Sequence, residues 1–141
     1  MTNTANTAGD IEKVVTQVIA DVRTRGDVAV REYAKAFDKS DLSEFEVSPK
    51  DRQAALAALD PQTRVDTEFA IENVRTFAEA QLATMLPLEI ELFPGAHLGH
   101  RIIPIERVGC YVPGGRYPLL SAPIMTLVPA KVAGCDEVIA C

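Results

Sequence analysis

The sequence predicts an α/β fold with an N-terminal helical segment, a β-hairpin, and then the first βαβ unit of a truncated Rossmann-like domain. Three successive patterns in the spacing of apolar residues lead to this prediction. Apolar residues recur every three or four positions up to about residue 83, alternate with glutamates after Pro87, and run continuously from Val108. These spacings are typical of amphipathic helices, of a half-buried strand and of a strand inside a parallel sheet. The predicted boundaries are a disordered N-terminus over 1–10, the helical segment over 11–83, the hairpin and linker over 84–106, and the incomplete Rossmann-like domain over 107–141.

The first predicted helix carries one continuous apolar stripe. Its members share one helical face and are Ile11, Val14, Val15, Val18, Ile19 and Val22. Gly26 supplies a C-terminal stop, and Asp27 can cap a second helix. The helical spacing of apolar residues continues from Val30 to Phe37, so we expect a helical hairpin or a kinked pair.

Two proline signals predict two further helices. Ser48-Pro49 and Asp60-Pro61 each place a capping residue before a proline at the first helical position. A short Ala-rich helix follows the first signal to about Leu59. The longer helix after the second signal has an apolar face formed by Val65, Phe69, Ala70, Val74, Phe77, Ala78 and Leu82.

The hairpin prediction depends on alternation. Apolar residues from Leu88 to Leu92 alternate with glutamates, so the apolar side should be half-buried and the glutamates should face water. The segment FPGA at 93–96 is typical of a turn. Residues 97–103 can then return as the second strand.

The final segment predicts one βαβ unit. The run VGCYV at 108–112 suits a strand that is buried on both faces of a parallel sheet. Ser121 can cap a helix that ends at Gly134, and residues 137–141 resume as a strand. Because a parallel strand normally has neighbours on both sides, we expect the sequence to be the front part of a longer protein.

Composition excludes several classes of partner. The 141 residues carry a net charge of −6, which would repel a nucleic acid backbone. The N-terminus, MTNTANTAGD, has neither a basic leader nor an apolar core, and no stretch approaches the ~18 apolar residues of a membrane span. We therefore expect a cytoplasmic protein with no nucleic acid or membrane partner.

Cysteine and histidine give weak signals for chemistry. Cys110, Cys135 and Cys141 show no CxxC spacing and lie in apolar contexts, so we interpret them as reduced, buried residues. His97 and His100 form an H-x-x-H pair, for which solvated histidines are the alternative to a metal site. The sequence shows no nucleophile with a base partner and no carboxylate pair at catalytic spacing.

Residues 108–118, VGCYVPGGRYP, place a glycine turn between a strand and a helix. Such a turn brings backbone N–H groups near a helix N-terminus, where an anion can bind. The G-x-G-x-x-G fingerprint is absent, so a tight corner and a ligand-lining loop both stay open. Arg116 beside the turn suits a carboxylate, phosphate or sulfonate, and a surface arginine packed on Tyr117 is the alternative.

Three stretches resemble the histidinol dehydrogenase family. They are VRTRGDVAVREYAKAFD at 22–38, IENVRTFAEAQ at 71–81, and RVGCYVPGGRYPLLSAPIMTLVPAKVAGCDEVIAC at 107–141. The last stretch is similar to the family's V-G-x-Y-[VI]-P-G-G turn and to the helix after it, which ends P-A-x-[IV]-A-G-C. The resemblance covers nearly the whole chain from about residue 11.

The resemblance implies an NAD- and zinc-dependent alcohol dehydrogenase that oxidises L-histidinol to L-histidine through the aldehyde. It also implies an intertwined homodimer whose Rossmann-like domains bind NAD without the glycine fingerprint. Tyr111 stands at the motif tyrosine, which contacts NAD in the family. The family's zinc ligands and catalytic Glu–His pair lie beyond residue 141. We therefore expect no catalytic or metal-binding residue here and no activity, unless a complementary C-terminal chain supplies them.

One departure from the motif concerns the substrate. Arg116-Tyr117 follows the glycine pair where members of the histidine pathway have small residues, and Pro123 lies in the helix. This variant resembles relatives that act on other alcohols, including sulfonated diols. Arg116 is accordingly the predicted substrate-binding residue. A third interpretation is a non-catalytic remnant or interaction fragment.

Overall fold

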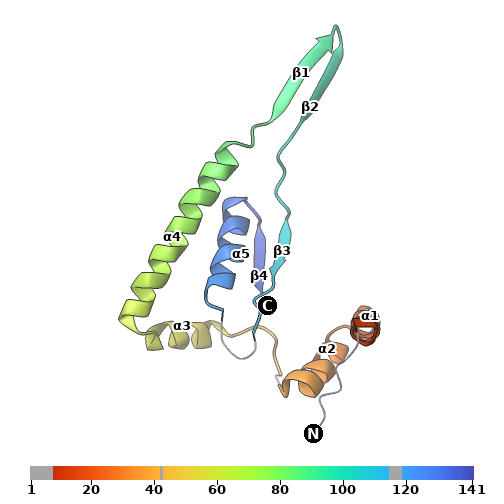
Figure 1. The fold of residues 1–141 in the computed structure, drawn as a ribbon, viewed down its shortest axis with the longest axis vertical. Coiled ribbons are helices and arrows are strands. Elements are labelled where there is room, and N and C mark those ends of the chain that lie inside the picture. The colour runs from red at the N-terminus through yellow and green to blue at the C-terminus, as the bar shows by residue number, and fades with distance from the viewer. Residues whose placement is uncertain (1–7, 42, 115–118) are drawn as a thin grey trace. The chain divides into compact units, whose positions relative to one another are not determined.

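The computed structural model describes residues 8–41, 43–114 and 119–141 (Figure 1). It divides into two compact units, Met1–Leu56 and Ala57–Cys141. The predicted α/β class is confirmed. The helices are α1 (Ala8–Arg25), α2 (Asp27–Tyr33), the π-helix η1 (Ala34–Asp38), α3 (Pro49–Ala58), α4 (Pro61–Ala83) and α5 (Ser121–Val132). The strands are β1 (Leu88–Phe93), β2 (Ala96–His100), β3 (Arg107–Cys110) and β4 (Glu137–Ala140).

In the first unit, α1 and α2 form a helical hairpin. Gly26 joins them with a φ of 57°, a conformation that favours glycine, and Asp27 is the first residue of α2 rather than its cap. Ala29 of α2 is fully buried, whereas Val14 and Val15 of α1 are each 50% exposed. Because α2 has only 7 residues, it is too short to cover the whole apolar stripe of α1.

Aromatic contacts close the segment after α2. The rings of Tyr33 and Phe37 stack with their centroids 5.5 Å apart. The guanidinium of Arg31 lies 4.5 Å from the centre of the Phe45 ring and also donates to the Ser43 carbonyl. These contacts hold the chain after η1 against α2.

Both helices that the proline signals predict are present. Before α4, the Asp60 carboxylate accepts a hydrogen bond from the Thr63 amide at 2.9 Å. Before α3, the Ser48 hydroxyl accepts from the Asp51 amide at 3.1 Å and donates to the Asp51 carboxylate at 2.6 Å. Each cap satisfies a backbone amide that the first turn of the helix leaves without a partner. Such a cap contributes about 1 kcal/mol to the free energy of unfolding.

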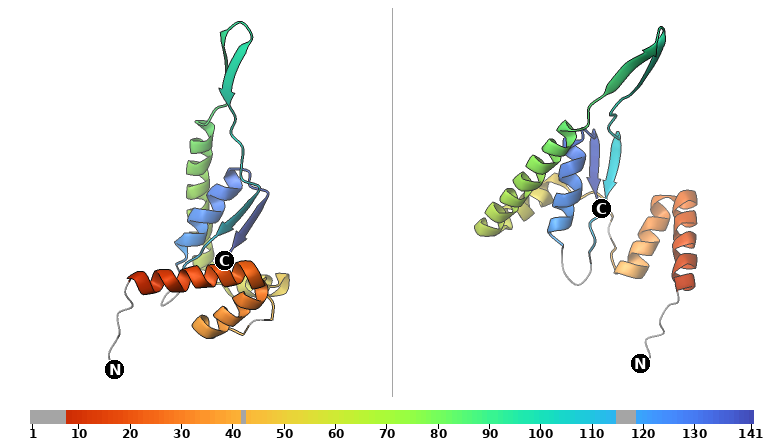
Figure 2. Two further views of the ribbon diagram at one scale, coloured as in Figure 1. Left: turned by 90° about the vertical axis from the view of Figure 1, so that its right-hand side faces the viewer. Right: turned by 45° about the horizontal axis from the view of Figure 1, so that its top comes forward.

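In the second unit, α4 packs along α5, and α5 packs against β3 and β4 (Figure 2). Ala78 of α4 and Val128 of α5 are each 9% exposed. Phe69 and Phe77, which belong to the predicted core face of α4, are 69% and 67% exposed. The 12 residues of α5 are too few to cover a helix of 23 residues.

The antiparallel hairpin of β1 and β2 is present, but its second strand ends at His100 rather than at residue 103. Leu88 pairs with His100, and the residue before Leu88 is a proline, which cannot continue the ladder. The glutamates face solvent as expected. Leu88 and Ile90 were expected to be half-buried and are 48% and 44% exposed, because no other element packs on that face among the described residues.

β3 and β4 pair in parallel, and α5 connects them as the crossover of a βαβ unit. The prediction that the strand at residues 108–112, now β3, is buried on both faces is wrong. Cys110, on the side of α5, is 4% exposed, whereas Ile139 on the other side is 52% exposed. Cys135 is also buried, but Cys141 is exposed, since it continues β4 on the uncovered side. Ser121 begins α5 and does not cap it; the cap position is Leu120.

Candidate functional site

The candidate site lies at the carboxyl ends of β3 and β4. Beyond the paired residues of the two strands, the Cys141 amide donates to the Cys110 carbonyl at 3.0 Å, and the Val112 amide donates to the Cys141 carbonyl at 2.6 Å. The two strands therefore stay paired through the position of Tyr111. Ligands of open α/β sheets bind outside this edge, where loops leave the strands.

Tyr111 is held by its neighbours but presents its side chain to solvent. Its backbone lies between the two hydrogen-bonded residues Cys110 and Val112. Its side chain is 70% exposed. An exposed ring on a fixed backbone can stack on a planar ligand group and offers a hydroxyl at its tip. The structure thus places the predicted cofactor-binding residue where such a contact can form.

The glycine turn is only partly described. Pro113 and Gly114 are placed, whereas Arg116, the predicted substrate-binding residue, lies outside the described residues. At the start of α5, the Ala122 amide already donates to the Leu119 carbonyl at 3.0 Å, and Pro123 has no amide hydrogen. The helix itself therefore offers few free donors to an anion. Anion binding at this site would depend on the turn.

The opposite end of the sheet carries an ion pair. Arg107 Nε lies 2.6 Å from a carboxylate oxygen of Glu137, at the first paired positions of β3 and β4. The hydrogen bond from this arginine to Glu137 raises the pKa of Arg107 above its usual range. The pair neutralises both charges at the start of the strands.

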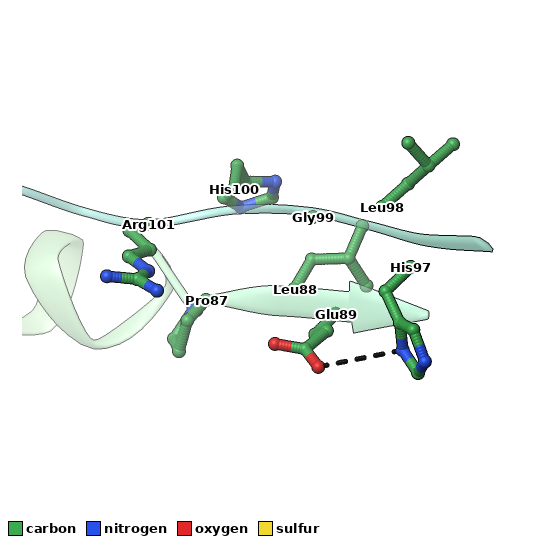
Figure 3. Close-up of a pocket in the computed structure, with 8 residues that line it drawn as sticks. All are labelled: Pro87, Leu88, Glu89, His97, Leu98, Gly99, His100 and Arg101. Carbon is green, nitrogen blue, oxygen red and sulfur yellow. Dashed lines mark ion pairs between the residues drawn. The ribbon is translucent and has the colours of Figure 1, made fainter. Parts of the chain in front are cut away.

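A second candidate is an open cleft of about 600 Å³ at the hairpin (Figure 3). His97 lies between two carboxylates, with Nδ1 at 3.8 Å from Glu89 and Nε2 at 3.9 Å from Glu91. His100 Nε2 lies 2.9 Å from the Leu86 carbonyl. Sequence reasoning missed this cleft, although the antiparallel register that opposes Glu91 to His97 follows from the turn at 94–95.

The hairpin cleft is a weak candidate for catalysis or metal binding. The side chains of His97 and Glu89 are 57% and 79% exposed, so water screens their interaction. Within the described ranges, no group of three or more His, Cys, Asp or Glu side chains is arranged to hold a metal ion. The residues that the structure describes do not fit a zinc site.

A third hollow, of about 340 Å³, lies between α4 and α5. Val74, Phe77, Met125 and Pro129 contribute its apolar part. It contains no charged side chain, which suits packing better than chemistry.

None of the helices that the structure describes is long and apolar enough to span a membrane.

The fold and the site together define an α/β protein whose parallel strands carry a tyrosine at their carboxyl edge, followed by Pro113 and Gly114. Over residues 1–141, the sequence matches the model of the histidinol dehydrogenase family. The chain belongs to the histidinol dehydrogenase family, a family of oxidoreductases.

Individual relatives support the family assignment, and one of them is named for a different alcohol substrate. Histidinol dehydrogenase homolog 1 of Mesorhizobium japonicum is 46% identical over 94% of this chain, which covers 27% of that protein. Histidinol dehydrogenase of Methanosarcina barkeri is 46% identical over 94% of this chain and 30% of its own length. Sulfopropanediol 3-dehydrogenase of Ruegeria pomeroyi is 42% identical over 95% of this chain and 31% of its own length.

A solved structure shows the same fold. The crystal structure of histidinol dehydrogenase from Elizabethkingia anophelis matches with a TM-score of 0.85 and 31% identity, over 99% of this chain and 32% of that one. The chain thus spans about a third of the length of the relatives that it matches.

Proposed function

We propose that the chain is the N-terminal portion of an NAD- and zinc-dependent alcohol dehydrogenase of the histidinol dehydrogenase type, which oxidises L-histidinol to L-histidine through the aldehyde. The observation that carries this proposal is the family match over residues 1–141. Residues 108–114 of the motif VGCYVPGG lie in β3 and directly after its carboxyl end. In the complete enzyme, NAD accepts hydride and zinc orients the alcohol.

In this proposal, the described residues bind the cofactor in part and perform no chemistry. Tyr111, 70% exposed at the strand edge, contacts NAD. Zinc ligands and the acid and base come from the remaining polypeptide, because the described residues offer no group able to hold a metal. The chain alone is then inactive, because the acid, the base and the zinc ligands are missing from it. It also binds NAD negligibly, since a few contacts cannot offset the entropy lost when a ligand is immobilised.

The partner that completes the enzyme is a complementary C-terminal polypeptide, and a homodimer is the proposed assembly. The exposed side chains of Phe69, Phe77 and Ile139 support this view, because surfaces of this kind normally face another part of a protein. We place the protein in the cytoplasm, in agreement with three cysteines that form no disulfide in the structure.

A second candidate substrate is a small anionic alcohol such as a sulfonated diol. The relative from Ruegeria pomeroyi, named sulfopropanediol 3-dehydrogenase, supports it at 42% identity. Arg116 beside the glycine pair would hold the sulfonate through paired N–H donors. The third candidate, a non-catalytic remnant or interaction fragment, requires that the restored protein oxidise no alcohol.

Restoration of the missing length tests the proposed function. Residues 1–141 joined to the remaining polypeptide of the Mesorhizobium japonicum homolog should reduce NAD in the presence of an alcohol, and the 141-residue chain should not. Tyr111→Ala in the fusion should raise KM for NAD by about tenfold while kcat changes less, because the variant removes a ring contact. Reduction of NAD by the 141-residue chain alone would contradict the proposed inactivity.

The two substrates are separated with the same fusion. NADH formation is measured with L-histidinol and with sulfopropanediol, before and after Arg116→Ala. If the enzyme prefers the sulfonated diol, the variant should lose about 10-fold to 100-fold in kcat/KM for it, as expected for a lost charge-assisted contact of about 1.5–3 kcal/mol. An unchanged preference in the variant excludes the role of Arg116 in reading the anion.

A further inference from the structure

The hairpin of β1 and β2 depends on its own residues for stability. Among the described elements, each of its strands packs only against the other. The large apolar side chains of Leu88, Ile90 and Leu98 are exposed. A hairpin of two strands that stands alone is only marginally stable in water. Weak interactions between its side chains therefore decide how much of the time it is formed.

Most charges of the hairpin lie on one of its two faces. Glu91 pairs with His97 in the register, and Glu89 pairs with Gly99. Paired residues of an antiparallel ladder point to the same side, and so do residues two positions apart along one strand. We call the side that these four residues share the charged face. Because Gly99 has no side chain, the imidazole of His97 approaches Glu89 diagonally across it (Figure 3).

Each ring nitrogen of His97 has a carboxylate of the charged face as its neighbour. Nδ1 lies 3.8 Å from Oε1 of Glu89, and Nε2 lies 3.9 Å from Oε1 of Glu91. The same oxygen of Glu91 accepts a hydrogen bond from the amide of Gly95 at 2.8 Å, within the turn. A charge on the imidazole would therefore act on both strands and on the residue that anchors the turn.

We propose that His97 is a proton-sensitive switch of the hairpin: its protonation strengthens the pairing of β1 with β2, and its deprotonation loosens that pairing. Histidine is the side chain that ordinarily changes charge between pH 5 and 8, whereas glutamates stay ionised there. A charged imidazole attracts both carboxylates across the ladder. A neutral imidazole offsets neither of them, and the two like charges of β1 remain side by side. Opposite charges on facing strands stabilise a sheet, and neighbouring like charges destabilise it.

The sign of the effect follows from the state in which the attraction exists. It requires paired strands and a charged His97, so the added stability is present toward pH 5 and is lost as the pH rises toward 8. Arg101, which lines the same cleft, keeps its charge over this range. Nε2 of His100 lies 2.9 Å from the Leu86 carbonyl, and an imidazole can donate such a bond whether neutral or charged. Neither residue should therefore produce the same response.

Hydrogen exchange of the full 141-residue chain, read by mass spectrometry on peptides of β1 and β2, tests the switch. The intrinsic exchange rate at each pH is divided by the measured rate, which removes the direct effect of pH on amide chemistry. Because water screens exposed charges, this protection should be about threefold higher near pH 5.5 than near pH 8. His97→Gln cannot be charged and should show the low protection at both pH values. His97→Lys stays charged and should show the high protection at both.

His100→Gln is the matched control on the other face of the hairpin, and it should keep the pH response of the parent chain. In about 1 M salt the response of the parent should largely disappear, because salt screens exposed charges. The switch is refuted if protection in the parent does not change with pH, or if the hairpin has none at either pH. An equal response in His97→Gln, or a lost response in His100→Gln, would also overturn it. These readouts measure exchange and not activity, so they do not depend on the proposed dehydrogenase function.

Discussion

A hydrogen bond between a tyrosine and an aspartate joins the two helices of the first unit. The Tyr33 hydroxyl donates to the Asp21 carboxylate at 2.5 Å. This bond lowers the pKa of Asp21, an effect that the charge of nearby Arg25 assists, and it raises the pKa of Tyr33. Arg25 also contacts Glu32 at 2.7 Å, and the hydrogen bond to that carboxylate raises the pKa of Arg25. The bond is strongest while Asp21 is ionised and Tyr33 is protonated.

The stability of this unit should therefore depend on pH at both ends of the scale. Because the pKa of Asp21 is lowered in the folded state, its stabilisation is present above its ordinary value of 3.8 and is lost as the pH falls through the lowered pKa. Because the pKa of Tyr33 is raised, its stabilisation is present below 10.0 and is lost as the pH rises through the raised pKa. Circular dichroism melts should show a lower Tm for Tyr33→Phe between these limits only. Tyr111→Phe, at a 70% exposed ring, is the control, and equal melting of Tyr33→Phe and the parent at every pH would refute the role.

At the same scale, the candidate site was only partly predictable. Tyr111 could be placed at a strand end from the motif, and the structure puts it there. The shortage of helix donors could not be foreseen in full, because the capping residue proved to be Leu120 and not Ser121. A serine at a helix start can serve either as the cap or as the first residue, and only backbone angles decide which. Arg116 stays a prediction.

The hairpin shows how one position can constrain an element. Gly99 lies opposite Glu89, and a Cβ added there would collide with the backbone carbonyl oxygen of Leu88. A backbone atom cannot swing away as a side chain can. Gly95 at the turn has a φ of 84°, which also favours glycine. The sequence predicts the role of Gly95 from the turn residues around it. The role of Gly99 depends on the register of the two strands, which the residues around it do not show.

Gly99→Ala should loosen the hairpin. The added methyl must displace the ladder at Leu88, so amides of β1 and β2 should exchange faster, by about tenfold for a local loss near 1.4 kcal/mol. Hydrogen exchange read by mass spectrometry measures this effect. The matched control is Gly9→Ala in α1, where a Cβ meets nothing within 4 Å and alanine favours the helix. Unchanged exchange in β1 and β2 would show that the collision is relieved without cost.

The βαβ element explains why strand burial was predicted wrongly. A continuous apolar run such as VGCYV indicates that both faces of a strand are covered. In the described structure, only the face toward α5 is covered, and Gly109 and Ile139 lie on the other. The sequence pattern therefore predicted the strand, its direction and its partner. An apolar run indicates that both faces of a strand need to be covered, but it does not show whether the covering elements are present.

Across the whole molecule, helices were more predictable than burial. Each predicted helix is present within a few residues of its expected bounds, because proline caps and apolar stripes are local signals. The buried apolar residues among those described are only Ala29, Ala78, Cys110, Val128 and Cys135. Most large side chains of the predicted core faces remain exposed, which no local signal could show. Burial depends on what packs against a face, and that information lies outside the element.

The Arg107–Glu137 pair, described as an electrostatic feature of the sheet, also bears on the order of folding. It joins residues 30 positions apart, so the loop that it closes is short and its entropic cost modest. The βαβ unit can then assemble on the ribosome soon after residue 141 has left the exit tunnel. From that moment both of its strands are sheet edges, with Ile139 and Tyr111 beside them, and such edges recruit other chains. During that interval these edges are the part of the unit most exposed to aggregation.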